Sequence, residues 1–140
     1  MMVWIKSFVA AFLATLVFHQ GVFGVMYLAG MVPAPPFNLE STPPLGVPAV
    51  VSLAFWGGLW GLPLWAVVRR MGDVGYWGLS LLFGALLPTA VAMLVVFPLK
   101  GMEVSVATWI GGFILNGAWG IGTALFMVLM GARRPPADEL

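Results

Sequence analysis

The sequence contains no cysteine, one histidine and few charged residues. Without cysteine the chain has no disulfide, thiolate metal site or CxxC redox pair. A catalytic metal needs about three protein ligands, and one histidine cannot supply them where no acid lies in any predicted helix. Its glycines do not follow strands, so a phosphate-binding loop is not expected either. We therefore predict no enzymatic activity and no cofactor.

Charge is scarce as well as evenly balanced. Only 8% of the 140 residues are charged and 61% are hydrophobic, whereas soluble domains average about 25% and about 45–50%. The net charge of +1 leaves no basic patch of the kind that binds nucleic acid. The eleven charged residues separate four uncharged stretches, which are residues 7–39, 41–68, 74–99 and 104–132.

Each uncharged stretch is longer than the roughly 20 residues that an α-helix needs to cross a bilayer. Backbone groups in hydrocarbon must pair within their own segment, which favours helices, and the runs lack the alternation of a β-barrel. The first run is too long for a signal peptide and has no cleavage site. We therefore predict an all-α integral membrane protein with one membrane domain, a four-helix bundle. Its transmembrane helices are residues 4–30, 49–68, 75–97 and 105–130, with a proline-rich loop at 31–48 and a tail at 131–140.

The basic residues predict the orientation, because Lys and Arg collect on the cytoplasmic side. With both termini inside, only Lys100 lies outside, and the other five are cytoplasmic: Lys6, Arg69, Arg70, Arg133 and Arg134. The absence of an organelle signal and the compact chain favour the bacterial inner membrane. The outer loop has six prolines in its 18 residues and should form a stiff strap, which is either a plain connector or a docking surface.

Small residues mark where helices approach each other, since close packing drives helix association in lipid. The expected packing positions are Gly57, Gly58, Gly61, Gly84, Gly112 and Gly120. The stretch GGLWGLP at 57–63 resembles NGAWGIG at 116–122, and both lie in the second helix of a hairpin. Two related hairpins in a parallel repeat are thus one possibility, and chance similarity of glycine-rich segments is the other.

Polar residues recur near the middle of every predicted helix. At a rise of 1.5 Å per residue, they fall within about 5 Å of the midplane. They are His19, Gln20, Trp56, Thr89 and Asn116. Trp60 and Trp119 lie just inward, and their indoles should donate to Gln20, Asn116 or the imidazole. We predict a central polar layer that either joins the helices or binds a ligand.

These observations leave three hypotheses for the function. The first is a non-catalytic accessory, assembly or scaffold component whose partners are the lipid bilayer and either itself or another membrane protein. The second is a small homo-oligomeric channel or carrier with its site in the polar layer, although a proton-coupled mechanism is disfavoured because the helices contain no carboxylate. The third is a haem- or pigment-binding subunit that uses His19.

Overall fold

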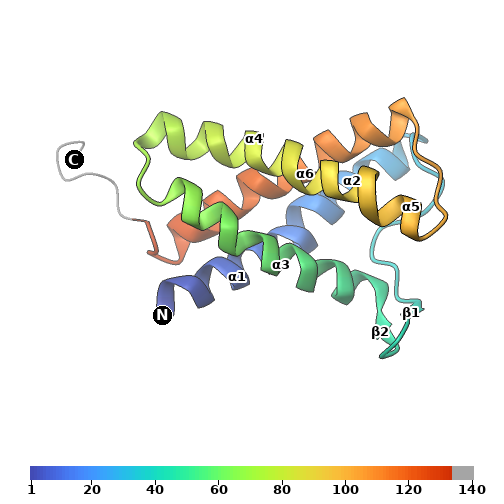
Figure 1. Cartoon of the computed structure of the whole chain (residues 1–140), viewed down its shortest axis with the longest axis horizontal. Coiled ribbons are helices and arrows are strands. Elements are labelled where there is room, and N and C mark those ends of the chain that lie inside the picture. The colour runs from blue at the N-terminus through green and yellow to red at the C-terminus, as the bar shows by residue number, and fades with distance from the viewer. Residues whose placement is uncertain (134–140) are drawn as a thin grey trace.

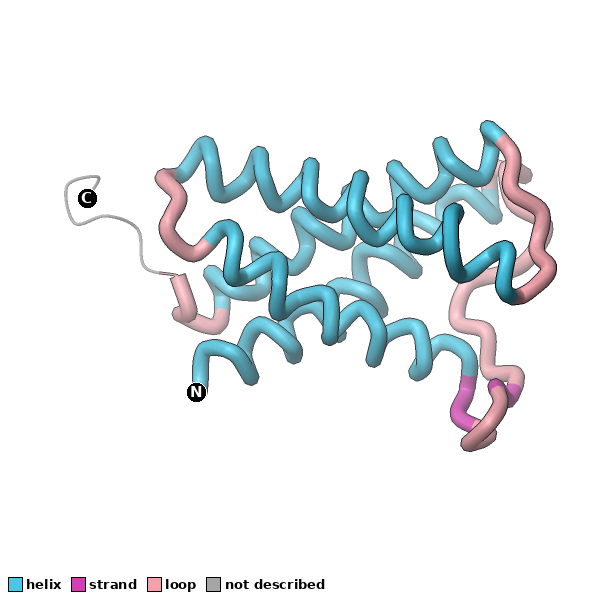
Figure 2. Tube along the Cα trace, in the orientation of Figure 1, coloured by secondary structure: helices cyan, strands magenta, loops and turns pink. Residues whose placement is uncertain are grey.

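The computed structural model describes residues 1–133 and is a bundle of four long helices (Figures 1 and 2). The first helix joins α1 (Met2–Ala14), a π-helical segment (Thr15–His19) and α2 (Gln20–Leu28). The second is α3 (Ala49–Val68). The third joins α4 (Asp73–Val91), a π-helical segment (Ala92–Val96) and α5 (Phe97–Leu99), and the fourth is α6 (Val106–Leu129).

All four helices are long and apolar enough to cross a membrane. Their ends differ by at most two residues from the ranges predicted above. The predicted tail begins at Gly131, and residues 134–140 lie outside the part of the chain described. The expected all-helical architecture with four long, apolar helices is therefore confirmed.

Local sequence explains where the helices stop and start. Three of them end in a glycine with positive φ, at Gly30, Gly101 and Gly131, and the next amide bonds back to the carbonyl five residues earlier. This is the C-terminal motif for which glycine is favoured. Ser105 caps the start of α6 and forms a reciprocal capping box with Thr108. That box satisfies two amides that would otherwise lack partners.

The helices pack as two hairpins, α1 with α3 and α4 with α6, and α1 also lies along α6. All six expected glycines face another helix at these crossings. A Cβ on Gly61 would overlap the Ser7 carbonyl, and one on Gly120 would overlap the Ser80 carbonyl. Backbones therefore approach so closely that a larger residue does not fit.

Two glycine contacts of the first hairpin have counterparts in the second. Gly61 meets Ser7 in the first hairpin and Gly120 meets Ser80 in the second. One turn away, Gly58 meets Phe8 as Gly117 meets Leu81. The corresponding residues are 73 apart in the first helices and 59 apart in the second helices. Trp4 and Trp77 keep the same spacing before the two serines, so the likeness extends beyond the glycine motif.

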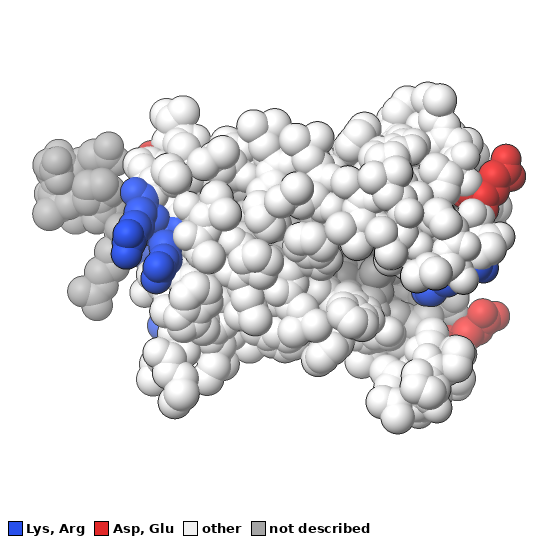
Figure 3. Space-filling view, in the orientation of Figure 1, with Lys and Arg blue, Asp and Glu red and all other residues white. Residues whose placement is uncertain are grey.

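On the face of the bundle seen in Figure 3, charged side chains of the described residues lie at the two ends and the middle shows none. At one end, where α3 turns into α4, Lys6 donates to the Met130 carbonyl, Arg69 lies over the Trp4 ring and Arg133 pairs with Asp73. The N-terminus and the end of α6 are at this same end (Figure 1). Lys100 follows α5 at the opposite end. Arg134 lies outside the described residues.

The proline-rich loop lies at the end of the bundle opposite the N-terminus and the end of α6. It contains a short antiparallel ladder between β1 (Ser41–Thr42) and β2 (Val47–Pro48). The amides of Ala49 and Val50 donate back to the carbonyls of Glu40 and Asn38. Hydrogen bonds as well as proline thus fix the shape of this segment.

Candidate functional site

Gln20 lies at the start of α2, immediately after the π-helical segment, and its side chain is buried. The Phe37 amide of the loop donates to Gln20 Oε1 at 2.7 Å. On the other side of the same carboxamide, Nε2 lies 3.3 Å from His19 Nδ1. The side chain therefore connects the first helix to the loop rather than to another helix.

The position of Phe37 explains why a glutamine is needed there. Gln20 is eight residues before Leu28, about 12 Å along the helix axis, so the loop folds back along the helix. Phe37 has φ of 59°, a conformation that is uncommon outside glycine. Nearby, a Cβ on Gly24 would lie 3.2 Å from Pro36 Cγ. Non-helical backbone at this depth needs an acceptor from the protein, and Gln20 supplies it.

The same contacts determine the protonation of His19. Because the Phe37 amide occupies Oε1 of Gln20, the group that faces His19 Nδ1 is the amide nitrogen, which is only a donor. Nδ1 must then be the acceptor, and in a neutral imidazole the proton is on Nε2. His19 therefore presents an N–H at its outer nitrogen.

Thr89 and Asn116 form a second, separate pair between α4 and α6. Asn116 Nδ2 donates to Thr89 Oγ1 at 3.0 Å, and Thr89 is fully buried. Gly112 leaves room for the Thr89 methyl group, which a Cβ there would overlap. This pair is a direct link between the two helices of the second hairpin.

A third group lies where α1, α3 and α6 meet. Trp119 Nε1 and the Thr15 hydroxyl both donate to the Ala11 carbonyl, each at 3.0 Å. Gly57 provides the space, since its missing Cβ would overlap the Thr15 hydroxyl and lie 3.3 Å from Trp119 Nε1. The expectation that the Trp119 indole donates to Gln20, Asn116 or the imidazole was wrong. Its acceptor is a backbone carbonyl. Because every residue has one, the sequence does not indicate which carbonyl is used.

Trp56 belongs to none of these groups. Its side chain is 60% exposed and its ring meets only Phe55 edge-on among the aromatic pairs of the described chain. Among the described residues, no hydrogen bond joins the pair His19–Gln20 to the pair Thr89–Asn116, and Trp56 faces outward. A ligand site in the polar layer stays a prediction. The rise per residue predicts only how deep a side chain lies along its helix. Whether two side chains meet also depends on the direction in which each points around its helix axis. The π-helical segment at residues 15–19 changes that direction for the residues after it.

Sequence reasoning missed one cluster at the basic end. Arg133 pairs with Asp73 and its guanidinium lies 3.8 Å from the centre of the Tyr76 ring. Tyr76 itself is buried and donates to the Ala124 carbonyl at 2.7 Å. An acid at the start of a helix and a base after the end of one interact favourably with the helix dipoles. Asp73 lies in the first turn of α4 and Arg133 follows α6, so their positions in the sequence could have indicated this cluster. The cluster fastens the second hairpin at its open end.

Within residues 1–133, no group of three His, Cys, Asp or Glu residues could hold a metal ion. Comparisons with protein-family models, curated proteins and solved structures find no match to this chain. The function therefore has to be argued from the geometry alone.

Proposed function

We propose that this chain is a non-catalytic accessory or scaffold component of a membrane complex. It resides in the bacterial inner membrane with both termini cytoplasmic. The orientation is supported by the basic residues of the described chain: Lys6, Arg69, Arg70 and Arg133 lie at one end of the bundle, and Lys100 follows α5 at the other.

A scaffold role is supported by the way the polar side chains are used. Gln20 holds the loop, Asn116 holds Thr89, and Trp119 holds the first helix through Ala11. Polar groups that already bond to one another contribute rigidity to the bundle. These three side chains therefore already bond to other parts of the protein.

The observation that carries the proposal is the exposed indole of Trp56. This residue is the eighth of the 20 in α3, about 4 Å from the middle of the helix along its axis. Tryptophan in membrane proteins is enriched at the interfaces, because its N–H needs a polar partner. At this depth lipid offers no acceptor, so a helix of another subunit supplies it.

The absence of native cysteine makes a clean test of this surface possible. Ser52→Cys places a thiol one turn from Trp56, and Leu86→Cys places one on the exposed side of α4. In native membranes, a thiol-reactive bifunctional cross-linker should join the Ser52→Cys protein to one discrete partner, whereas Leu86→Cys should give no discrete product. Mass spectrometry of the product then separates a second copy from a different membrane protein.

A second arm tests the indole itself. Trp56→Leu should abolish the cross-link at Ser52→Cys and reduce the size of the complex in mild detergent. Phe113→Leu, a similar change at an exposed site on α6, should leave both unchanged. A chain that migrates alone in mild detergent and forms no cross-link contradicts the proposal.

The two alternatives gain no comparable support. A channel or carrier needs its polar residues along one path, but His19–Gln20 and Thr89–Asn116 are separate, internally bonded pairs. A haem ligand usually bonds iron through one ring nitrogen and donates an N–H from the other. In His19 the contact with Gln20 makes Nδ1 an acceptor, so haem binding requires that contact to break.

A further inference from the structure

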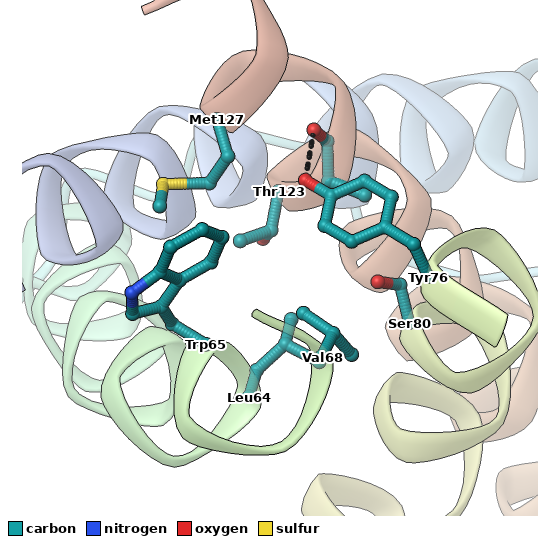
Figure 4. Close-up of a pocket in the computed structure, with 8 residues that line it drawn as sticks. Leu64, Trp65, Val68, Tyr76, Ser80, Thr123 and Met127 are labelled. Carbon is teal, nitrogen blue, oxygen red and sulfur yellow. Dashed lines mark hydrogen bonds between the residues drawn. The ribbon is translucent and has the colours of Figure 1, made fainter. Parts of the chain in front are cut away.

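A small cavity lies between α3, α4 and α6 (Figure 4). Its volume is about 10 Å³, counted over the positions open to the centre of a water molecule. One water needs about 10–15 Å³ by this measure. The cavity therefore has the size of a single water.

Two residues that line this cavity have a buried polar atom without a partner, Ser80 through its Oγ and Trp65 through its Nε1. The Ser80 side chain is fully buried, and its Oγ makes no hydrogen bond within the described residues. Figure 4 shows the hydroxyl pointing from α4 into the space between the helices. A buried hydroxyl without a partner costs about 1–3 kcal/mol, so a native structure is expected to satisfy it.

Two further residues that line the same cavity, Tyr76 and Thr123, have hydroxyls with unused capacity. Tyr76 donates to the Ala124 carbonyl at 2.7 Å, and Thr123 donates to the Trp119 carbonyl at 2.9 Å. Each oxygen still has lone pairs that can accept. One donor and two acceptors match the roughly three hydrogen bonds of a typical buried water.

The first hairpin, which has the same serine–glycine contact, allows a comparison with the hydroxyl cluster of Ser80, Tyr76 and Thr123. Ser7, the counterpart of Ser80, donates to the Trp4 carbonyl at 2.8 Å. At the same offsets of 73 and 59, the counterparts of Tyr76 and Thr123 are Val3 and Leu64. The hydroxyl cluster thus exists only in the second hairpin.

We propose that the cavity binds one ordered water, which accepts from Ser80 and donates to Tyr76 and Thr123. The water links α4 to α6 beside Leu64 of α3. Trp65 does not take part, because its nitrogen points away from Tyr76 and Ser80 (Figure 4). This inference depends only on the interior of the bundle and not on the partner proposed above.

The test is a crystal structure at a resolution that shows ordered waters, for the wild type and two variants. A single peak should lie within hydrogen-bond distance of Ser80 Oγ in the wild type and in Ser7→Ala, the matched control. In Ser80→Ala the peak should disappear or move out of the cavity. Thr123→Val, which keeps the side-chain shape, should lower its occupancy.

Two results overturn the proposal. One is a wild-type structure without the peak, in which Ser80 donates to the Tyr76 carbonyl one turn earlier, as serine in helices often does. The other is a peak that is unchanged in both Ser80→Ala and Thr123→Val.

Discussion

Replacing Gln20 by leucine should release the loop from the first helix. The change keeps a side chain of similar size but removes the only acceptor that the structure gives the Phe37 amide. The bond is part-buried and Phe37 is 49% exposed, so its loss costs at most the roughly 1–3 kcal/mol of a buried N–H without a partner. Since about 1.4 kcal/mol is a factor of ten, the Phe37 amide should exchange with solvent deuterium faster, by up to about 150-fold.

The measurement is hydrogen–deuterium exchange by mass spectrometry in detergent micelles, followed on a peptide that contains Phe37. Asn116→Leu is the matched control, because it removes another part-buried amide that bonds only to Thr89. It should leave the loop peptide unchanged. Wild-type exchange at Phe37 in Gln20→Leu would refute the claim that the glutamine holds the loop.

Three further predictions concern the packing and the basic end, and unfolding in detergent measures each of them. Gly61→Leu should destabilise the bundle by about 1–3 kcal/mol or more through overpacking. A Cβ at Gly78 would meet nothing within 4 Å, so Gly78→Ala should be neutral or slightly stabilising. Equal effects of the two changes would contradict the close approach at Gly61. Trp119→Phe loses the indole donor and part of a buried ring, so it should cost more than the roughly 1 kcal/mol of the hydrogen bond alone; an unchanged stability would argue against that bond. Asp73→Asn should cost at most about 1 kcal/mol, because its carboxylate is 43% exposed and such ion pairs are weak; a loss of several kcal/mol would show that Arg133 depends on it.

The fold was largely predictable because its signal is one of composition. Uncharged runs of this length must form helices in lipid, and their bounds follow from Lys, Arg, Pro and Gly at the ends. The glycine positions could be predicted as packing sites, because small residues are where helices approach each other. The residues that each glycine contacts could not be predicted. The contacts of Gly61 with Ser7 and of Gly120 with Ser80 depend on which helices become neighbours.

The site was less predictable because depth along a helix does not fix its rotation. Gln20 was expected to face other helices and instead bonds to a loop residue that folds back along α2. Trp56 shares the depth of the polar residues but faces outward. Trp119 bonds to a backbone carbonyl, and carbonyls are present at every position, so the sequence could not single out Ala11.

The most direct test of the central claim, that four helices cross a membrane and place the basic end inside, is thiol labelling in intact cells. Leu45→Cys lies at an exposed site in the proline-rich loop, and Gly72→Cys lies in the open turn between α3 and α4. A reagent that cannot cross membranes should label Leu45→Cys directly and Gly72→Cys only after the cells are permeabilised. Labelling of both sites in intact cells, or of Gly72→Cys alone, would contradict the topology.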